Sequence, residues 1–292
     1  MIRYRDGREV SAASGQDKLL ARIYGSVWGR ALLRPLVSPV VSKAAGAFLS
    51  SPLSCFLIKP FIEKNGIDMA QYEAVRYRSY NEFFSRKIRR DARAIDMQPD
   101  TLIAPCDSKL TVLPIGEDCR FTLKHTPYTV ASLLRDEALA KRYEGGYALI
   151  FRLTVDDYHR YSYVADGEKG ENVRIPGVLH TVNPVANDHY PIYKENSREY
   201  SVLHTGVFGD VLMMEVGALL VAGSSTTTER RRLRAGRRRA ISSSAVLRWC
   251  CCLRRAGCAS TRTSSPIRRT ALKLSSGWAK PSAARRAGRL SE

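Results

Sequence analysis

The sequence predicts an α+β protein in which N-terminal helices precede a mostly antiparallel β core. Between residues 17 and 70, apolar residues recur at the three-to-four spacing of amphipathic helices. Residues 101–221 instead contain short β-type runs separated by Gly, Pro and Asp. No long helices alternate with them, which disfavours a doubly wound parallel sheet. We therefore expect a helical region (1–70), a β-rich core (71–221) and a tail (222–292) of different composition.

The helical region begins with apolar positions that include Leu20, Tyr24 and Val27, with arginines between them. The next stretch, residues 36–58, is apolar but is interrupted by two prolines and a lysine. Because it offers no run of about 18 apolar residues, a membrane-spanning helix is disfavoured. Two interpretations stay open, namely ordinary core helices and amphipathic helices that lie on a membrane surface.

The β-rich core contains two helix signals. Ser79 precedes the segment Tyr80–Phe84, and Glu82 follows three residues after the serine, which is the pattern of a capped helix start. A further helix is expected near Val130–Tyr143. The remaining runs of residues 101–221 are expected to form antiparallel strands.

The tail carries most of the net charge of +19. It holds 18 basic and 2 acidic residues, whereas residues 1–221 hold 29 basic and 26 acidic residues. The tail lacks apolar periodicity, and we expect it to be disordered. A basic tail is typical of proteins that bind nucleic acid or anionic membranes. Its only aromatic residues are Trp249 and Trp278, too few to stack bases well, so nucleic acid is not an expected partner.

The cysteines predict neither a disulfide framework nor a metal site. There are 7 of them, an odd number at irregular spacing. Cys250, Cys251 and Cys252 are adjacent, but no second cysteine pair or histidine follows at a zinc-binding spacing. We therefore expect no metal.

Three segments of the core carry candidate functional residues. Asp107 follows Pro105 and Cys106, a position that also suits a turn. His159 stands in the run Asp156-Asp157-Tyr158-His159-Arg160-Tyr161, and His180 stands in the segment 175–184. Taken singly, these residues also fit a turn former, a surface histidine and a strand residue.

Taken together and in this order, the three segments resemble the phosphatidylserine decarboxylases. Three more segments share the resemblance, and they are Tyr80–Lys87, Glu195–Arg198 and Val216–Ala218. The similarity runs from about Tyr72 to Val221, roughly half the chain. Several motifs in the right order make it specific, although each motif alone is weak.

The resemblance implies a bacterial proenzyme that cleaves itself at a Gly-Ser bond and converts the serine to a pyruvoyl cofactor. The mature enzyme would convert phosphatidylserine to phosphatidylethanolamine and carbon dioxide. By position, Asp107 would be the orienting carboxylate and His159 the base, with His180 as the backup base or a substrate-facing residue. The implied partners are phosphatidylserine in an anionic membrane and the chain's own cleaved small fragment. The implied location is peripheral, on the cytoplasmic side of the bacterial cell membrane.

The sequence departs from this family where the cleavage motif is expected. No Gly-Ser-Thr or Gly-Ser-Ser motif follows at the family's distance after Val216-Gly217-Ala218. Gly223-Ser224 comes soon after that strand, which is too close, so Ser224 is a poor candidate for the cleaved serine.

The genetic code offers a reason for the departure. In a shifted reading frame, each codon would consist of the last base of the codon for one residue of this sequence and the first two bases of the codon for the next residue. Residues 243–251 can then encode Phe-Gly-Gly-Ser-Thr-Val-Val-Leu, and residues 223–227 can encode Ile-Val-Asn-His. We hypothesise that the sequence runs out of frame from about Val221, and we call the shifted product the frame-restored chain. The alternative is a catalytically dead remnant that binds lipid surfaces and lacks the cleavage serine.

Overall fold

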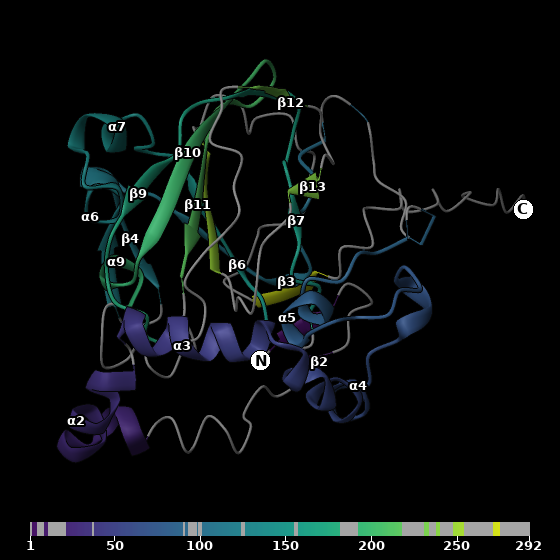
Figure 1. Cartoon of the computed structure of the whole chain (residues 1–292). Helices are drawn as coiled ribbons and strands as arrows, with labels where there is room; N and C mark the ends of the chain where they lie inside the picture. The colour runs from purple at the N-terminus through teal and green to yellow at the C-terminus, as the bar shows by residue number, and fades with distance from the viewer. Residues whose placement is uncertain are drawn as a thin grey trace, which may run out of the picture.

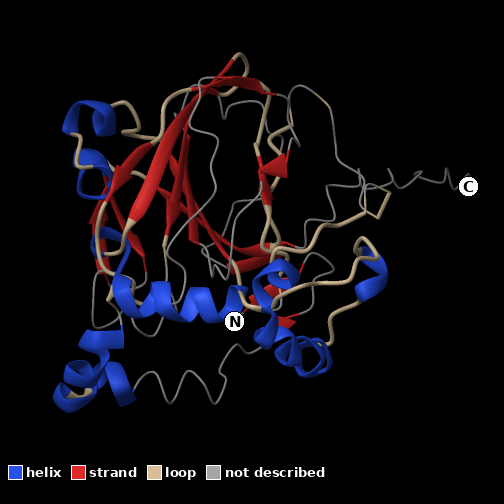
Figure 2. Cartoon of the chain, in the orientation of Figure 1, coloured by secondary structure: helices blue, strands red, loops and turns tan. Residues whose placement is uncertain are grey.

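The N-terminal helices gather at one end of a large β-sheet in the computed structural model (Figures 1 and 2). The structure describes residues 2–4, 9–10, 22–36, 38–89, 91–92, 98, 101–123, 126–154, 157–181, 192–217, 231–233, 238–239, 248–253 and 271–274. The α+β class expected from the sequence is confirmed, with N-terminal helices followed by mainly antiparallel strands.

The helical part of the chain is residues 22–89, much as the sequence predicts for residues 17–70, although the strands Ile2–Tyr4 and Glu9–Val10 lie within the region (1–70) expected to be helical. Its elements are α2 (Val27–Leu36), α3 (Pro39–Ser50), η1 (Pro52–Leu57), α4 (Ile58–Asn65), η2 (Met69–Gln71) and α5 (Tyr80–Phe84). Ser38 caps α3 by accepting a hydrogen bond from the Val41 N–H, and a proline occupies the first turn. Gly66 ends α4 in the left-handed conformation at φ 58°. We refer to residues 22–89 as the helical layer.

The cap predicted for α5 is present, because Ser79 Oγ accepts a hydrogen bond from the Glu82 N–H at 3.2 Å. The helix expected near residues 130–143 is instead two short helices, α6 (Val130–Leu134) and α7 (Glu137–Lys141). Arg135 between them adopts φ 54°, which ends α6, and the Asp136 side chain starts α7 by accepting from the Leu139 N–H.

The large sheet has the order β12-β8-β10-β11-β14-β6-β3-β15-β1-β2, and β9 pairs with β10. Its strands are β1 (Ile2–Tyr4), β2 (Glu9–Val10), β3 (Ser108–Pro114), β6 (Tyr147–Arg152), β8 (Gly167–Lys169), β9 (Val173–Ile175), β10 (Arg198–Thr205), β11 (Gly209–Val216), β12 (Arg231–Leu233), β14 (Arg248–Leu253) and β15 (Ala271–Leu274). All pairings are antiparallel except β1 with β15. Two small sheets pair β4 (Arg120–Leu123) with β5 (Thr126–Thr129) and β7 (Tyr161–Ser162) with β13 (Arg238–Arg239).

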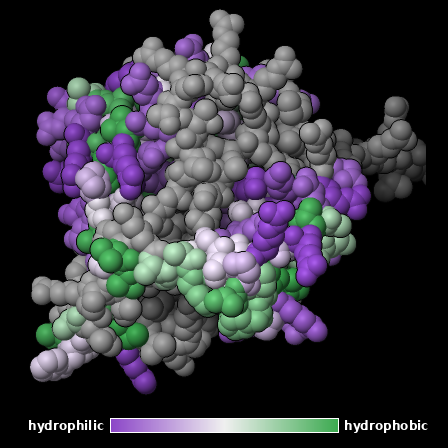
Figure 3. Space-filling view, viewed as in Figure 1, coloured by the Kyte–Doolittle hydropathy of each residue, from purple (hydrophilic) through white to green (hydrophobic). Residues whose placement is uncertain are grey.

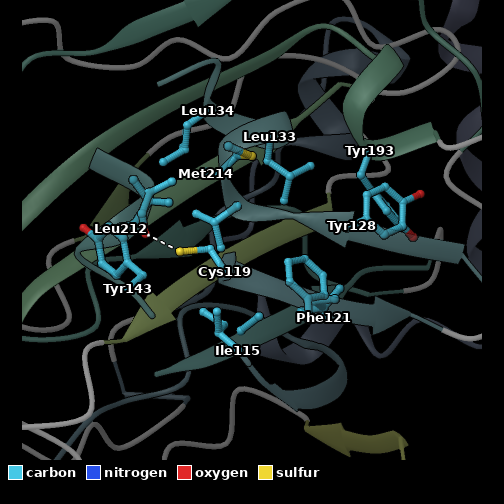
Figure 4. Packing of buried hydrophobic residues seen from close by; sticks show 14 of the residues in the cluster. Ile115, Cys119, Phe121, Tyr128, Leu133, Leu134, Tyr143, Tyr193, Leu212 and Met214 are labelled. Carbon is cyan, nitrogen blue, oxygen red and sulfur yellow. Dashed lines mark hydrogen bonds between the residues drawn. The ribbon is translucent and has the colours of Figure 1, made fainter. Parts of the chain in front are cut away.

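The two faces of the central strands support separate apolar clusters. Along β11, Leu212 and Met214 belong to one cluster, while Val211 and Met213 belong to the other, which is the period-two alternation of a strand. Figure 4 shows the first cluster, where α6 and β4–β5 cover the sheet. The Cys119 thiol in this cluster donates to the Ala140 carbonyl at 3.2 Å.

The tail, which the sequence predicts to be disordered, contributes only the short strands β12, β13, β14 and β15 to the described chain. The rest of residues 222–292 lies outside the described residues. Strand β14 has a central place, because it lies between β11 and β6 and pairs with both over its full length. The position in the sheet between β11 and β6 is therefore filled by residues of the tail and not by residues of the β-rich core.

Within the described residues, no single helix has the length and apolar character needed to cross a membrane. The segments Ala44–Ser50 and Pro52–Asn65 meet that requirement only as a pair, and they are bent by 78° relative to each other.

Candidate active site at one end of the sheet

One end of the sheet is marked by a row of paired residues that crosses five strands. Their Cα pairings run from Lys109 in β3 through Arg152, Arg248 and Val216 to Arg198 in β10. We call this the site end. In Figure 1 the β10–β11 turn lies at the opposite end, and α3 crosses beneath the site end. Each candidate segment enters or leaves the sheet here, since Asp107 precedes β3, His159 follows β6 and His180 follows β9.

Asp107 is buried, and its segment is fixed to the segment that carries His159. The Ser162 N–H donates to the Pro105 carbonyl at 2.8 Å, so residues 105–107 run beside residues 161–162. Burial raises the pKa of the Cys106 thiol well above its usual value, and the carboxylates of Asp107 and Asp157 act in the same direction. Both carboxylates therefore lie near this thiol.

His159 is buried, and a hydrogen bond fixes its tautomer. Its Nδ1 lies 2.8 Å from the Asp157 carbonyl oxygen. Because a carbonyl only accepts, Nδ1 carries the proton in the neutral ring, and the lone pair resides on Nε2. The turn that presents this carbonyl is held by the Asp157 carboxylate, which accepts from the Thr154 N–H at 2.7 Å and from its hydroxyl at 2.9 Å.

The segment that carries His159 packs against the end of α5. The His159 ring lies 4.0 Å from the Phe84 ring between centroids. On either side, Arg160 Nε donates to the Ser85 carbonyl at 2.7 Å, and the Tyr158 hydroxyl accepts from the Ile88 N–H at 3.3 Å. The helical layer therefore positions the histidine.

His180 is held at the site end by one asparagine. Asn196 accepts from the His180 N–H at 3.1 Å and donates to the His180 carbonyl at 2.8 Å. The same amide donates to the Gly217 carbonyl at 2.8 Å, just past the end of β11. From the helical layer, the Tyr24 ring lies 6.0 Å from the His180 ring.

The His180 Nε2 lies 3.9 Å from a Glu195 carboxylate oxygen, but the two groups do not behave as an ion pair. Burial lowers the pKa of His180, and burial also raises the pKa of Glu195. Both shifts favour the neutral forms, whereas a strong ion pair would shift each pKa the other way. Desolvation therefore outweighs the attraction between the two groups.

Sequence reasoning did not identify a buried pair between the two segments. The Tyr161 hydroxyl donates to the Glu215 carboxylate, and both residues are buried. Glu215 is two residues before Gly217, and Tyr161 is two residues after His159, so this pair links the two histidine segments through β11. The available signal was a carboxylate inside the apolar run Met213-Met214-Glu215-Val216.

The structure thus brings Asp107, His159 and His180 to one end of the sheet, whereas Ser224 lies outside the described residues. Over the described part of the chain, no group of His, Cys, Asp and Glu has the arrangement of a metal site. The site end combines a histidine of defined tautomer with buried carboxylates. Such a histidine can take a proton from, or return it to, a nucleophile within hydrogen-bond reach of Nε2.

Comparison with known proteins gives consistent matches. Residues 80–243 match the model of the phosphatidylserine decarboxylase family. Phosphatidylserine decarboxylase proenzyme 2 of Clostridium acetobutylicum is 46% identical over 214 residues, 73% of this chain and 72% of the relative. The phosphatidylserine decarboxylase proenzyme of Ruminiclostridium cellulolyticum is 39% identical over 70% of each chain. That of Desulfitobacterium hafniense strain Y51 is 35% identical over 76% of this chain and 77% of its own.

Proposed function

The chain belongs to the phosphatidylserine decarboxylase family, and on this premise we propose that its frame-restored form is a self-cleaving proenzyme. The mature enzyme would convert phosphatidylserine to phosphatidylethanolamine and carbon dioxide. The observation that carries the proposal is the row of strand ends around β14. Asp107, His159 and His180 all lie just past this row, and the start of β14 is part of it.

The shifted frame places its serine at the same end. In that frame the codon for serine spans residues 246 and 247, and the codons for Val-Val-Leu fall within β14. Arg248 at the start of β14 pairs with Val216 and Arg152. A serine just before this point would enter the sheet beside Gly217, where the candidate residues gather. This agreement supports a lost reading frame.

The printed chain itself does not fit a pyruvoyl cofactor. Strand β14 of this chain contains no serine, and Ser224 lies outside the described residues. A pyruvoyl group, when present, supplies an electron-withdrawing carbonyl that stabilises the carbanion left by loss of carbon dioxide. We therefore assign the activity to the frame-restored chain and not to the printed one.

In the frame-restored chain, His159 would act as the base for self-cleavage. Because its Nδ1–H is bonded to the Asp157 carbonyl, Nε2 would accept the proton of the serine hydroxyl. Asp107 remains the proposed orienting carboxylate, but because the Asp157 carbonyl occupies Nδ1, it would act through the segment bonded to Ser162 and not on that ring nitrogen. His180 is proposed as the residue that faces the substrate, with the role of base as its alternative.

We also propose that the helical layer rests on the membrane that holds the substrate. Large apolar side chains are exposed on its helices, among them Trp28 (85% exposed), Leu53 (74%) and Phe56 (68%). Figure 3 shows apolar surface along this part of the molecule. Such exposed apolar groups are typical of peripheral membrane proteins. The cytoplasmic side of a bacterial membrane is the proposed location.

Expression of the printed and the frame-restored chains side by side tests the enzyme proposal. Denaturing gels with mass spectrometry would show two fragments for the frame-restored chain, the smaller one blocked at its N-terminus, and release of carbon dioxide from phosphatidylserine. The printed chain should stay intact at 32.6 kDa. If the frame-restored chain also stays intact and inactive, the proposal is wrong, and the dead lipid-binding remnant is the better reading.

A further inference from the structure

A buried arginine in the helical layer has hydrogen-bond donors that the described protein does not satisfy. Arg86 is 1% exposed, and its Nε and Nη1 have no hydrogen-bond partner. Its one side-chain hydrogen bond runs from Nη2 to the Tyr72 hydroxyl at 3.3 Å. No carboxylate among the described residues forms an ion pair with it. Because a guanidinium stays charged in proteins, a buried arginine without an anion is an unfavourable arrangement that a ligand would correct.

The surroundings of Arg86 are aromatic walls and one more unsatisfied hydroxyl. Its Cζ lies 4.4 Å from the Tyr72 ring centroid and 5.0 Å from the Phe83 ring centroid. The Tyr77 ring packs on Phe83 at 5.4 Å, and the buried Tyr77 hydroxyl has no partner. Arg86 lies close enough to Tyr77 to act on its pKa, which burial nevertheless raises. We call Tyr72, Tyr77, Phe83 and Arg86 the Arg86 cluster.

The donors of this cluster match an oxyanion. Two guanidinium nitrogens, Nε and Nη1, and the Tyr77 hydroxyl remain available as donors, and the Tyr72 hydroxyl can donate its own proton while it accepts from Nη2. The cation–π contacts stabilise the charge without using those donors. The nearby carboxylates do not fill the role. Glu73 and Glu82 both raise the pKa of Tyr77, but both residues are exposed. Glu82 also accepts a hydrogen bond from the Arg78 N–H at 2.5 Å.

The position of the cluster indicates which anion it would bind. On one side Phe61 of α4 contacts Phe83 at 6.0 Å, and the Cys55 thiol of η1 donates to the Tyr77 carbonyl at 3.7 Å. These are the helices that expose apolar side chains. On the other side, Ile88 bonds to Tyr158, the neighbour of His159. The cluster therefore lies between the proposed membrane surface and the proposed base.

We propose that Arg86, with the hydroxyls of Tyr72 and Tyr77, binds the phosphate diester of a phospholipid and so holds the headgroup beside His159. A phosphate diester joins the headgroup to the glycerol, so it is the anion nearest the acyl chains. In a bound lipid, the phosphate lies between the acyl chains and the headgroup. The Arg86 cluster lies in the same way between the apolar helices and the site end. The inference rests on the proposed function for the identity of the lipid, but binding does not require self-cleavage.

Calorimetric titration of the purified full-length printed chain tests this inference. The probes are dihexanoylphosphatidylserine below its micelle concentration, dihexanoylglycerol as its phosphate-free counterpart, and inorganic phosphate. The phospholipid should bind, and the other two should bind much more weakly. Arg86→Met should weaken phospholipid binding about 10- to 100-fold, the effect of one or two hydrogen bonds to a charged group.

Two tyrosine variants keep the test decisive if Arg86→Met folds poorly. Tyr77→Phe removes one donor and should weaken binding about threefold to tenfold. Tyr200→Phe is the matched control, because Tyr200 is also buried but lies on β10, in the apolar cluster of Leu212 and Met214. It should bind like the unmodified chain. Equal binding by Arg86→Met or by Tyr77→Phe would overturn the inference.

Other outcomes separate this inference from the proposed function. Inorganic phosphate that binds as tightly as the phospholipid would overturn the lipid assignment, as would an unmodified chain that binds no phospholipid. If the phospholipid binds in an Arg86-dependent way while the frame-restored chain neither cleaves itself nor releases carbon dioxide, the phosphate site stands and the enzyme proposal fails. If the frame-restored chain is active and Arg86→Met leaves its KM unchanged, the enzyme stands and the phosphate site fails.

Discussion

The β region (residues 101–217) and the helical layer differ in how they satisfy a buried arginine and in how much large apolar surface they expose. In the β region, buried Arg198 donates to the carbonyls of Leu133, Lys194, Asn196 and Ser132 at 2.6–3.1 Å. In the helical layer, buried Arg86 keeps two donors without partners. The helical layer also exposes the largest apolar side chains, such as Trp28 and Leu53.

The two regions therefore differ in what satisfies a buried guanidinium and in what covers their apolar surface. The β region satisfies the guanidinium of Arg198 from its own backbone and buries its apolar side chains in two clusters. The helical layer has both an unsatisfied cation and an uncovered apolar surface. A phospholipid supplies the matching pair, an anionic phosphate and acyl chains.

The largest expected effect concerns chemistry at the site end. In the frame-restored chain, His159→Ala should slow self-cleavage about 10²- to 10⁴-fold, because a positioned general base contributes that much. His180→Ala should slow it far less, since His180 is assigned to the substrate side. Quantifying intact and cleaved chains on gels over time measures both rates. The assignment of the base is wrong if His180→Ala gives the larger loss.

The next effect compares the two buried arginines. Arg198→Met should lower the free energy of unfolding by about 3–5 kcal/mol, because several buried carbonyls lose their donor. Arg86→Met should change it by less than about 1 kcal/mol or raise it, because removal of an unpaired buried charge offsets the lost packing. Urea denaturation of the printed chain measures both. A large loss in Arg86→Met would mean that this arginine is structural and would remove the contrast.

Parts of the fold of both regions could be predicted from the sequence. The helices of residues 17–70, the Ser79 cap and the antiparallel strands follow from local periodicity and capping signals. The meeting of Asp107, His159 and His180 does not, because it depends on strand order, and β14 separates β11 from β6 although 95 residues lie between β6 and β14. The resemblance to the family is what points to these residues in the sequence.

Other features were beyond the sequence for physical reasons. Nothing in the sequence distinguishes Arg86 from the other arginines, because its burial depends on the tertiary fold. The break between α6 and α7 depends on the positive φ of one residue, Arg135. The composition of the tail predicts disorder and gives no sign of the short strand β14, which pairs along its whole length with two strands. Backbone pairing can be met by many sequences, so it does not report whether Arg-Trp-Cys-Cys-Cys-Leu belongs there.

A smaller effect concerns the exposed apolar surface of the helical layer. Leu53→Asp and Phe56→Asp should each weaken partitioning onto phosphatidylglycerol vesicles about tenfold, as expected when one large apolar contact with the membrane is lost. Val207→Asp is the matched control, because Val207 is also exposed, at 48%, but lies in the β10–β11 turn at the opposite end. Vesicle sedimentation measures the partitioning. An equal loss in Val207→Asp would show that charge alone decides binding.

The smallest effect is a pH dependence where the two regions meet. The His180 ring lies against Tyr24 of the helical layer, and burial lowers its pKa from the ordinary 6.5. The unfolded chain then binds the proton more tightly than the folded chain does. The stability that His180 contributes is present above pH 6.5 and is lost as the pH falls toward its lowered pKa. Glu195 has the opposite sign, because its pKa is raised from 4.5, so its contribution is present at low pH and is lost as the pH rises through its folded value.

The two signs make the groups separable in one titration of stability. Between pH 7.5 and 5.5 the free energy of unfolding should fall slightly in the printed chain, and His180→Gln should flatten this fall because the protonating group is gone. Glu195→Gln should leave the fall in place and alter the profile only at lower pH, since the two groups do not form a strong ion pair. If Glu195→Gln instead steepens the fall near pH 6, the carboxylate was stabilising protonated His180. The 3.9 Å contact between His180 and Glu195 would then be a functional ion pair. His180 would in that case be held by a polar group of the β region.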